Sequence, residues 1–200
     1  MYAVTPAPRD EPFGAACHPC TTHHPQHISN ARRTLSMTKP QPPPVSLLDK
    51  HFGTEFLPLY IGTVFVNGGE ARHARASGVA RSDDGMLDVQ LRMPEELGGS
   101  GGGTNPEQLF AAAFAGCFHG ALSLLAARAK VAIPDAEVVA RVAFGRDPVD
   151  GMFMLSADIR IRLPGVDRTV AGELVRHTER LCPYAKMARA GIDCVVSLDP

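Results

Sequence analysis

The chain has 200 residues, of which 44% are hydrophobic, and its formal net charge is −1 at pH 7. This length is sufficient for one well-buried core, and the nearly balanced charge implies no polyanionic partner such as nucleic acid. The N-terminus has no basic start followed by an apolar run, so we recognise no secretory signal and expect a cytoplasmic protein with reduced cysteines.

The first part of the chain, residues 1–46, is rich in proline, histidine, serine and threonine and has few clustered apolar residues. Such a composition cannot offset the entropy lost on ordering, so we predict a disordered extension over residues 1–50 and a folded domain over residues 51–200. The extension contains side chains at spacings that zinc could use: Cys17, Cys20, His23, His24 and His27. Histidine-rich unstructured tails are common, and we therefore expect no metal site.

The first half of the folded domain contains three β-rich runs separated by turn signals. Asn67-Gly68-Gly69 follows the first run, and Ser82-Asp-Asp-Gly85 follows the second. These signals favour antiparallel strands joined by tight turns. We therefore predict an antiparallel meander from residues 59–66, 75–81 and 87–93.

A glycine-rich loop, residues 98–103, precedes the strongest helical pattern in the chain. Thr104 or Asn105 can cap this helix and Pro106 suits its first position, so we predict a helix from there to about Lys130. Its long apolar stretch is interrupted by glycine, histidine and serine, which favours a core helix over a membrane span. The loop lacks the Gly-Lys-Ser/Thr ending of a phosphate-binding loop, so we interpret it as a mobile lid.

The last part of the chain alternates as strand, strand, helix and strand. We predict strands over residues 138–144 and 153–163, a helix capped by Asp167 that ends at Leu181, and a closing strand over residues 192–198. The resulting order, βββαββαβ, is typical of an α+β fold. In the closing strand, Cys194 alternates with apolar neighbours, which predicts a core-facing side chain.

Two further cysteines carry the candidate chemistry: Cys117, on the long helix, and Cys182, at the exit of the next helix. Such a pair can act as a nucleophile and a resolving thiol. Cys117 belongs to an apolar stripe, and burial alone would raise its pKa and make it inert. Arg72 or Arg75 could supply the cation that favours a thiolate, with Glu107 holding the guanidinium in place.

A cysteine hydrolase is an alternative, because His119 and His177 could act as bases for Cys117. A nucleophile elbow places glycine two residues before and two residues after the nucleophile, and here those positions are Ala115 and His119. A non-enzymatic redox sensor is a second alternative, but no basic recognition helix or other output surface is evident. We favour peroxide chemistry over both.

Several motifs together resemble the organic hydroperoxide resistance (Ohr) branch of the OsmC superfamily, over about residues 59–198. The motifs are Leu59-Tyr60, Gly68-Gly69, Ser82–Val89, Glu96–Gly99, Gly103–Ala112, Cys117-Phe118, Leu163–Gly165 and Cys182–Tyr184. The resemblance implies an α+β fold with antiparallel sheets around a long central helix, and an intertwined homodimer. It assigns the peroxidatic cysteine to Cys117, the resolving cysteine to Cys182 and the activating glutamate to Glu107.

One position departs from the family pattern. The family places its catalytic arginine directly after the Gly-Gly pair, but Glu70 follows Gly69 here, and several residues are inserted before Gly78. Alignment backward from Gly78 puts the arginine at Arg75, one residue out of register. We take Arg75 as the activating arginine and Arg72 as the reserve.

The resemblance implies a peroxidase that reduces alkyl and fatty-acid hydroperoxides through a Cys117 sulfenic acid and a Cys117–Cys182 disulfide. Dihydrolipoyl groups of lipoylated proteins would recycle it, and no metal, heme or flavin is needed. We expect an apolar substrate pocket walled by Phe110, Phe114, Met152, Phe153 and Met154.

Glu107 and Cys117 are ten residues apart, about 15 Å along an uninterrupted helix. A single arginine would have difficulty in reaching both side chains across that distance. Either the helix breaks between them, or two chains build each site.

Overall fold

The computed structural model describes residues 50–69 and 76–198. The chain divides into two units, residues 1–59 and residues 60–200. The described residues of the first unit, 50–59, contain no helix or strand, and every element described below belongs to the second unit. The tail through residue 49 lies outside the described residues, so its disorder stays a prediction.

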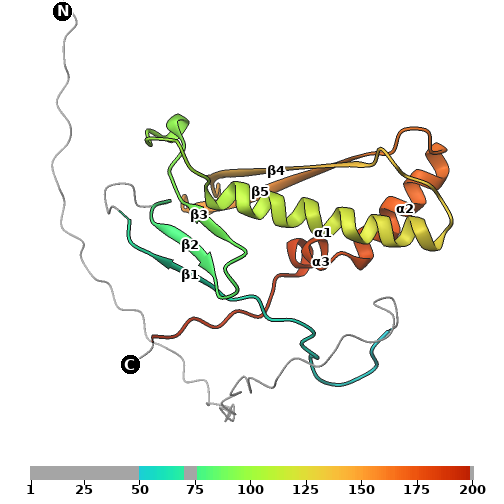
Figure 1. The fold of residues 1–200 in the computed structure, drawn as a ribbon, viewed down its shortest axis with the longest axis horizontal. Helices are drawn as coiled ribbons and strands as arrows, with labels where there is room; N and C mark the ends of the chain where they lie inside the picture. The colour runs from blue at the N-terminus through green and yellow to red at the C-terminus, as the bar shows by residue number, and fades with distance from the viewer. Residues whose placement is uncertain (1–49, 70–75, 199–200) are drawn as a thin grey trace, which may run out of the picture. The chain divides into compact units, whose positions relative to one another are not determined.

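The second unit is an α+β fold in which two antiparallel sheets accompany one long helix (Figure 1). Its elements, in chain order, are β1 (Val64–Asn67), β2 (Val79–Ser82), β3 (Asp88–Gln90), a short 3₁₀ helix η2 (Glu95–Leu97), α1 (Pro106–Arg128), β4 (Glu137–Arg146), β5 (Phe153–Arg162), α2 (Arg168–Leu181) and α3 (Pro183–Ala190). The predicted fold class is confirmed.

The first three strands form the predicted meander, in the order β1-β2-β3. Val64 pairs with Ser82, and Val79 pairs with Gln90. The turn between β2 and β3 needs Gly85, whose φ is +75°, a conformation that side chains with a Cβ rarely adopt. The described strands are shorter than the sequence pattern predicts, and the start of the predicted second strand, Arg75, lies outside the described residues.

The long helix α1 begins where its capping residues predict. The Asn105 side chain accepts a hydrogen bond from the Gln108 backbone amide at 2.9 Å, and Pro106 occupies the first helical position, where its missing N–H is not needed. By length and composition α1 could cross a membrane. In the structure it packs against β4, α2 and α3, as a core helix does.

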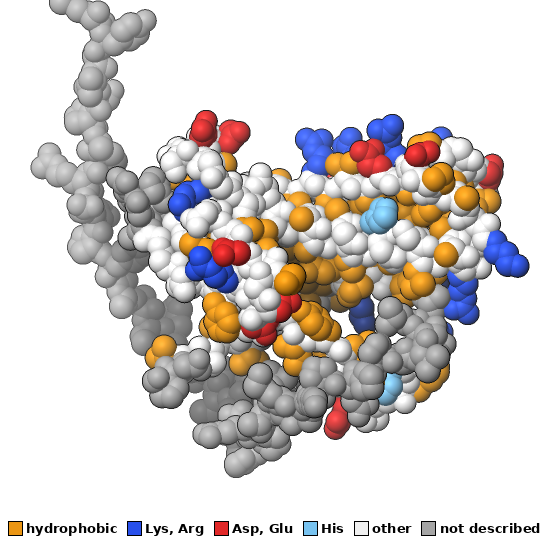
Figure 2. All heavy atoms as spheres, in the orientation of Figure 1, with side chains coloured by type: hydrophobic (Ala, Val, Ile, Leu, Met, Phe, Trp, Pro, Cys, Tyr) orange, Lys and Arg blue, Asp and Glu red, His pale blue; other side chains and the backbone are white. Residues whose placement is uncertain are grey.

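The hairpin of β4 and β5 covers one face of α1 with apolar side chains, among them Val138, Ala140, Ile159 and Ile161. Its other face carries exposed charges, including an ion pair between Arg162 and Glu137 at 3.0 Å. Lys and Arg side chains gather over this hairpin in Figure 2. The hairpin is therefore amphipathic, with one face towards the helix and the other towards water.

The C-terminal part differs from the prediction in two ways. The helix α2 begins as expected, with the Asp167 carboxylate accepting hydrogen bonds from the amides of Thr169 and Val170. A further helix, α3, then follows between Leu181 and residue 192, where no helix or strand was predicted. The predicted closing strand, residues 192–198, is wrong for the single chain: the segment forms no strand, and Cys194 is exposed and not core-facing. A strand needs a paired neighbour, and no described strand of this chain pairs with the segment.

Candidate active site

The structure brings the two candidate cysteines together across 65 positions of sequence. The Sγ atoms of Cys117 and Cys182 lie 3.5 Å apart, and the Cys182 thiol donates a hydrogen bond to the Cys117 sulfur. Both thiols are free. Since a disulfide needs an S–S distance of about 2.05 Å, the sulfurs are within a small movement of bonding.

Cys117 lies midway along α1, at the border between its packed and its exposed face. Its neighbours Phe114 and Phe118 are buried, with 4% and 3% of their surface exposed, whereas Gly116 and His119 are exposed. The Cys117 side chain itself is half-buried. This position gives the sulfur an apolar surrounding and access from outside the core.

Cys182 is fully buried, with 0% of its surface exposed. It is the last residue before α3 and the C-cap of α2, so the two helices meet at this residue. Its backbone amide donates to the Thr178 carbonyl at 2.8 Å, and its carbonyl accepts from the Lys186 amide at 3.1 Å. The helix junction therefore fixes the backbone of Cys182 from both sides.

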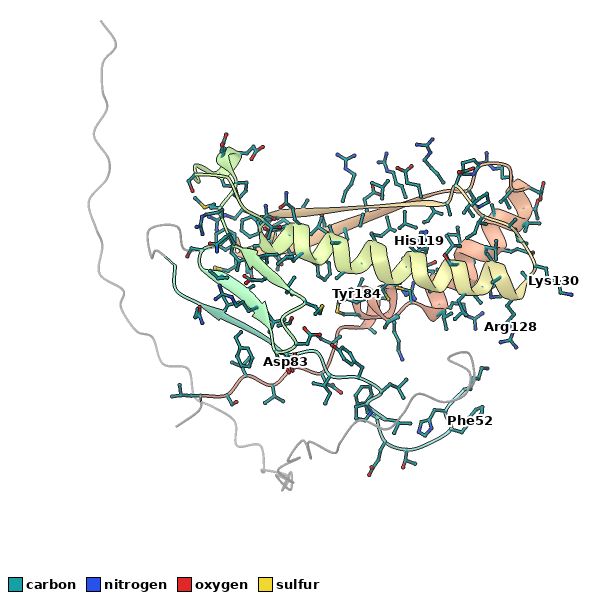
Figure 3. The ribbon with its side chains drawn as sticks, in the orientation of Figure 1. Phe52, Asp83, His119, Arg128, Lys130 and Tyr184 are labelled. Atoms are coloured by element: carbon teal, nitrogen blue, oxygen red, sulfur yellow. The ribbon has the colours of Figure 1, made fainter. Side chains whose placement is uncertain are left out.

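Three aromatic rings surround the thiol pair. The rings of Phe110 and Phe114 contact edge to face, with centroids 6.1 Å apart, and Tyr184 lies against both, at 6.1 and 5.9 Å. Tyr184 belongs to α3 and faces α1 (Figure 3). Together with Phe118, these side chains belong to the apolar cluster around Cys117 and Cys182.

The surroundings of Cys117 act on its pKa in opposite directions. Burial raises the pKa of the Cys117 thiol above its ordinary value, and the neighbouring Cys182 thiol raises it further. A hydrogen bond from the Tyr184 backbone amide, at the start of α3, lowers the same pKa. Because the upward effects dominate, a thiolate at neutral pH requires a further positive charge nearby.

The residues predicted to provide that charge, Arg72 and Arg75, lie outside the described residues. Glu107 is half-buried in the first turn of α1. The helix is continuous from Pro106 to Arg128, so the expected alternative of a break between Glu107 and Cys117 is wrong. The two side chains are separated by about 15 Å of helix within one chain.

The two histidines considered as bases for a cysteine hydrolase do not lie in the buried cluster around Cys117 in the described part of the chain. His119 and His177 are both exposed. His119 is two residues after Cys117, about 200° around α1, and therefore projects from a different face (Figure 3). Among residues 50–69 and 76–198, no group of three or more histidine, cysteine, aspartate or glutamate side chains could hold a metal ion.

The five predicted pocket walls divide into two groups. Phe110 and Phe114 lie at the cysteine pair, as described above. Met152, Phe153 and Met154 are exposed at the start of β5, and they are not among the side chains packed around the cysteines in the single chain. Phe153 stacks instead on Phe144, with ring centroids 4.8 Å apart.

The contribution of α3 to the site was not predicted from the sequence. Pro183 directly after Cys182 could have indicated a helix start, because proline is favoured at the first helical position. The helix brings the Tyr184 ring and amide to Cys117, and Ala185 to the buried cluster. The family resemblance implied that Cys117 and Cys182 come together, and the structure places their sulfurs 3.5 Å apart.

The family model for OsmC-like proteins matches residues 99–197. The organic hydroperoxide resistance protein of Xanthomonas axonopodis pv. citri is 42% identical over 131 residues, which cover 63% of this chain and 92% of that protein. The organic hydroperoxide resistance protein OhrB of Bacillus subtilis is 37% identical over 140 residues, which cover 70% of this chain and 98% of that protein. The crystal structure of OhrB superposes with a TM-score of 0.57 at 37% identity, covering 68% of this chain and 95% of the other.

Proposed function

The chain belongs to the organic hydroperoxide resistance (Ohr) branch of the OsmC family, and from this premise we propose that it is a peroxidase that reduces organic hydroperoxides with Cys117 and Cys182. The observation that carries the proposal is the contact between the two free thiols, 3.5 Å apart in an apolar cluster. A contact between a half-buried and a fully buried thiol suits a nucleophile and its resolving partner.

The proposed reaction has two oxidative steps. The Cys117 thiolate attacks the outer oxygen of the hydroperoxide, the O–O bond breaks, and the released alkoxide takes a proton to leave as an alcohol. Cys117 is then a sulfenic acid. Cys182 attacks the sulfenic sulfur, the S–O bond breaks, and the hydroxyl leaves as water, so that a Cys117–Cys182 disulfide remains.

Activation of Cys117 requires a cation, because its described surroundings raise the thiol pKa. We assign this role to Arg75, with Arg72 as the alternative candidate. We assign to Glu107 the role of holding the guanidinium. Glu107 and Cys117 of one chain are too far apart along the continuous α1 to share an arginine easily. Each site would therefore combine Cys117 and Cys182 of one copy with Glu107 of a second copy.

The composition of α1 supports such a homodimer. The helix is mostly apolar, with small or apolar residues on every side and His119 and Ser123 as polar exceptions in its middle, and a helix of this kind is normally buried over most of its surface. In the single chain one face packs on the hairpin, while Ala112, Gly116, Gly120 and Leu124 are exposed on the other. Packing of α1 against a second copy would cover this face.

The apolar cluster at the thiol pair favours alkyl and fatty-acid hydroperoxides over hydrogen peroxide, because Phe110, Phe114 and Tyr184 offer no polar contact to a small hydrophilic substrate except the Tyr184 hydroxyl. A dithiol, and specifically the dihydrolipoyl group of a lipoylated protein, would return the disulfide to two thiols by exchange. The chemistry needs no metal, heme or flavin, and reduced thiols suit a cytoplasmic location.

The purified full chain should consume dihydrolipoamide in the presence of cumene hydroperoxide, and more slowly with hydrogen peroxide at the same concentration. Cys117→Ser is the control for uncatalysed thiol oxidation. Oxidation of the cysteine pair without turnover would favour the alternative of a redox sensor. Faster turnover with hydrogen peroxide would contradict the proposed substrate class.

A further inference from the structure

An arginine near the end of α3 contacts a glutamate near the end of α2, and Cys182 lies between the two residues in the sequence. Arg189, in the last turn of α3, contacts the Glu179 carboxylate through Nη1 and donates a hydrogen bond to the Glu179 backbone carbonyl through Nη2 at 3.1 Å. The two residues are 10 positions apart, with Cys182 between them. The contact therefore closes a loop around the residue that carries the resolving thiol.

The remaining support for α3 comes mainly from its first turns. The helix has eight residues, too few to be stable by itself in water. Near its start, Ala185 is buried against the cluster that contains Phe114 and Phe118, and Tyr184 contacts Phe110 and Phe114. These contacts anchor the beginning of α3 to α1.

The second half of α3 lies over a cavity. An apolar cavity of about 250 Å³ is bounded by Phe114, Ile159 and Val175, and by Ala188 and Arg189 of α3. Glu179 of α2 also borders it. The cavity borders the second half of α3, and among the described residues the polar contacts between this half and α2 are those of Arg189 with Glu179.

We propose that Arg189 and Glu179 are positioning residues for the resolving step, since their contact keeps the α2–α3 junction closed and Cys182 against Cys117. The inference rests on the peroxidase function proposed above. In the resolving step the two sulfurs must approach from 3.5 Å to about 2.05 Å. A change in the angle between α2 and α3 that moves Cys182 away from Cys117 therefore lowers the fraction of molecules in which the two sulfurs can react.

Loss of the contact should leave the first oxidation of Cys117 unchanged and slow its resolution. A sulfenic acid that is resolved more slowly has more time to react with a second hydroperoxide molecule. That molecule transfers one oxygen atom to the sulfur and becomes an alcohol, and Cys117 becomes a sulfinic acid, which is irreversible. The ratio of sulfinic acid to disulfide therefore reports on the junction, separately from overall stability.

The test compares the full-length wild type with Arg189→Ala during turnover with cumene hydroperoxide and dihydrolipoamide. Mass spectrometry measures the fraction of Cys117 lost to sulfinic acid per turnover. We expect about a two- to five-fold increase in Arg189→Ala, the range that follows from losing a half-exposed ion pair. The second-order rate constant of the first oxidation, measured without reductant, should stay at the wild-type value.

The chain offers a matched control, because α2 also carries an exposed ion pair between Arg176 and Glu173 at 3.7 Å. Arg176→Ala should keep the wild-type ratio of sulfinic acid to disulfide. Arg189→Lys should give a ratio between those of the wild type and Arg189→Ala, because lysine keeps the positive charge but lacks the planar fork of the guanidinium. A wild-type ratio in Arg189→Ala, or an equal increase in Arg176→Ala, would overturn the inference while leaving the peroxidase intact. Absence of turnover in the wild type would instead refute the proposed function.

Discussion

The helices and the β4–β5 hairpin bury a shared apolar core against one another, although the start of β5 stays exposed, whereas the meander β1–β3 and the C-terminal segment leave many of their apolar side chains exposed. Leu122 of α1 is 0% exposed, but Phe65 of β1 is 58% and Leu198 of the segment 97% exposed. Hydrophobic side chains are visible on the surface in Figure 2. Both regions have apolar residues in regular patterns, so the difference arises from the presence or absence of a packing partner. The proposed second copy would supply the missing partner.

The largest expected effect is in the buried region, at the thiol pair. Cys117→Ser should abolish turnover with organic hydroperoxides, because the serine hydroxyl is not oxidised by peroxide. Cys182→Ser should still reduce the first hydroperoxide but then accumulate sulfinic acid at Cys117. Dihydrolipoamide consumption and mass spectrometry measure the two outcomes.

Both variants should fold, since serine is nearly the size of cysteine. The buried hydroxyl at position 182 would cost some stability unless it retains a hydrogen bond, so a melting curve should accompany the assay. Full turnover of Cys182→Ser with dihydrolipoamide would show that the two-cysteine mechanism is wrong.

The next largest effect tests whether an arginine in the segment between β1 and β2 lowers the pKa of the Cys117 thiol. Arg75→Ala should raise the pKa of the Cys117 thiol, because burial and Cys182 already raise it and the balancing charge would be lost. Since only the thiolate reacts, the rate of Cys117 oxidation should fall sharply at neutral pH and recover as the pH increases. Titration of thiolate absorbance checks the direction.

Two further variants test the same activation of Cys117. Glu107→Ala should resemble Arg75→Ala, because it frees the guanidinium, whereas Arg72→Ala should have a much smaller effect. An unchanged Cys117 pKa in Arg75→Ala would transfer the role to Arg72 or remove arginine activation from the mechanism.

A smaller effect concerns the exposed face of α1. In the single chain, a Cβ atom added at Gly120 would meet no atom of the described residues within 4 Å outside the backbone of α1 itself. Gly120→Leu should therefore be harmless to a monomer but should overlap with a second copy packed on this face. We expect it to weaken dimerisation and to reduce turnover, as measured by light scattering and the dihydrolipoamide assay.

Gly120→Ala is the control, because alanine raises helix propensity by about 0.5–1 kcal/mol with little added volume. It should keep the dimer. If Gly120→Leu is instead as active and as dimeric as Gly120→Ala, the second copy does not pack on this face of α1.

The smallest effect is expected for the N-terminal extension. Its composition cannot provide a core, so deletion of residues 1–46 should leave the peroxidase rate and the melting temperature nearly unchanged. A large loss of stability together with loss of stoichiometric zinc would contradict this prediction, and metal analysis of both forms distinguishes the two results.

Local signals in the sequence predicted most of the fold. The capping residues Asn105 and Asp167 located both helix starts, because a cap acts through bonds to the next few residues. The closing strand failed for the opposite reason: alternation predicts an extended segment, but pairing depends on a distant edge. The helix α3 was missed because it is short and begins directly after α2.

Of the predicted site, the structure brings together Cys117 and Cys182, while the roles of Glu107, Arg72 and Arg75 stay predictions. A resemblance to a family indicated Cys117 and Cys182, while their contact depends on how the α2–α3 junction packs on α1. The support of that junction by Arg189 has no sequence signature, because its partner is ten residues away and neither residue belongs to a recognised motif.

The two sulfurs differ in exposure, and this difference decides which of them the dithiol attacks when it reduces the disulfide in the proposed cycle. Cys182 is fully buried, while Cys117 lies at the edge of the cluster. In the proposed cycle an incoming thiol would therefore attack the more exposed Cys117 sulfur, form a mixed disulfide and expel Cys182 as the leaving group. The resolving cysteine would never be joined to the reductant. The second thiol of the dithiol would complete the exchange by attacking the reductant's own sulfur in the mixed disulfide, which forms the oxidised dithiol and releases Cys117 as a thiol.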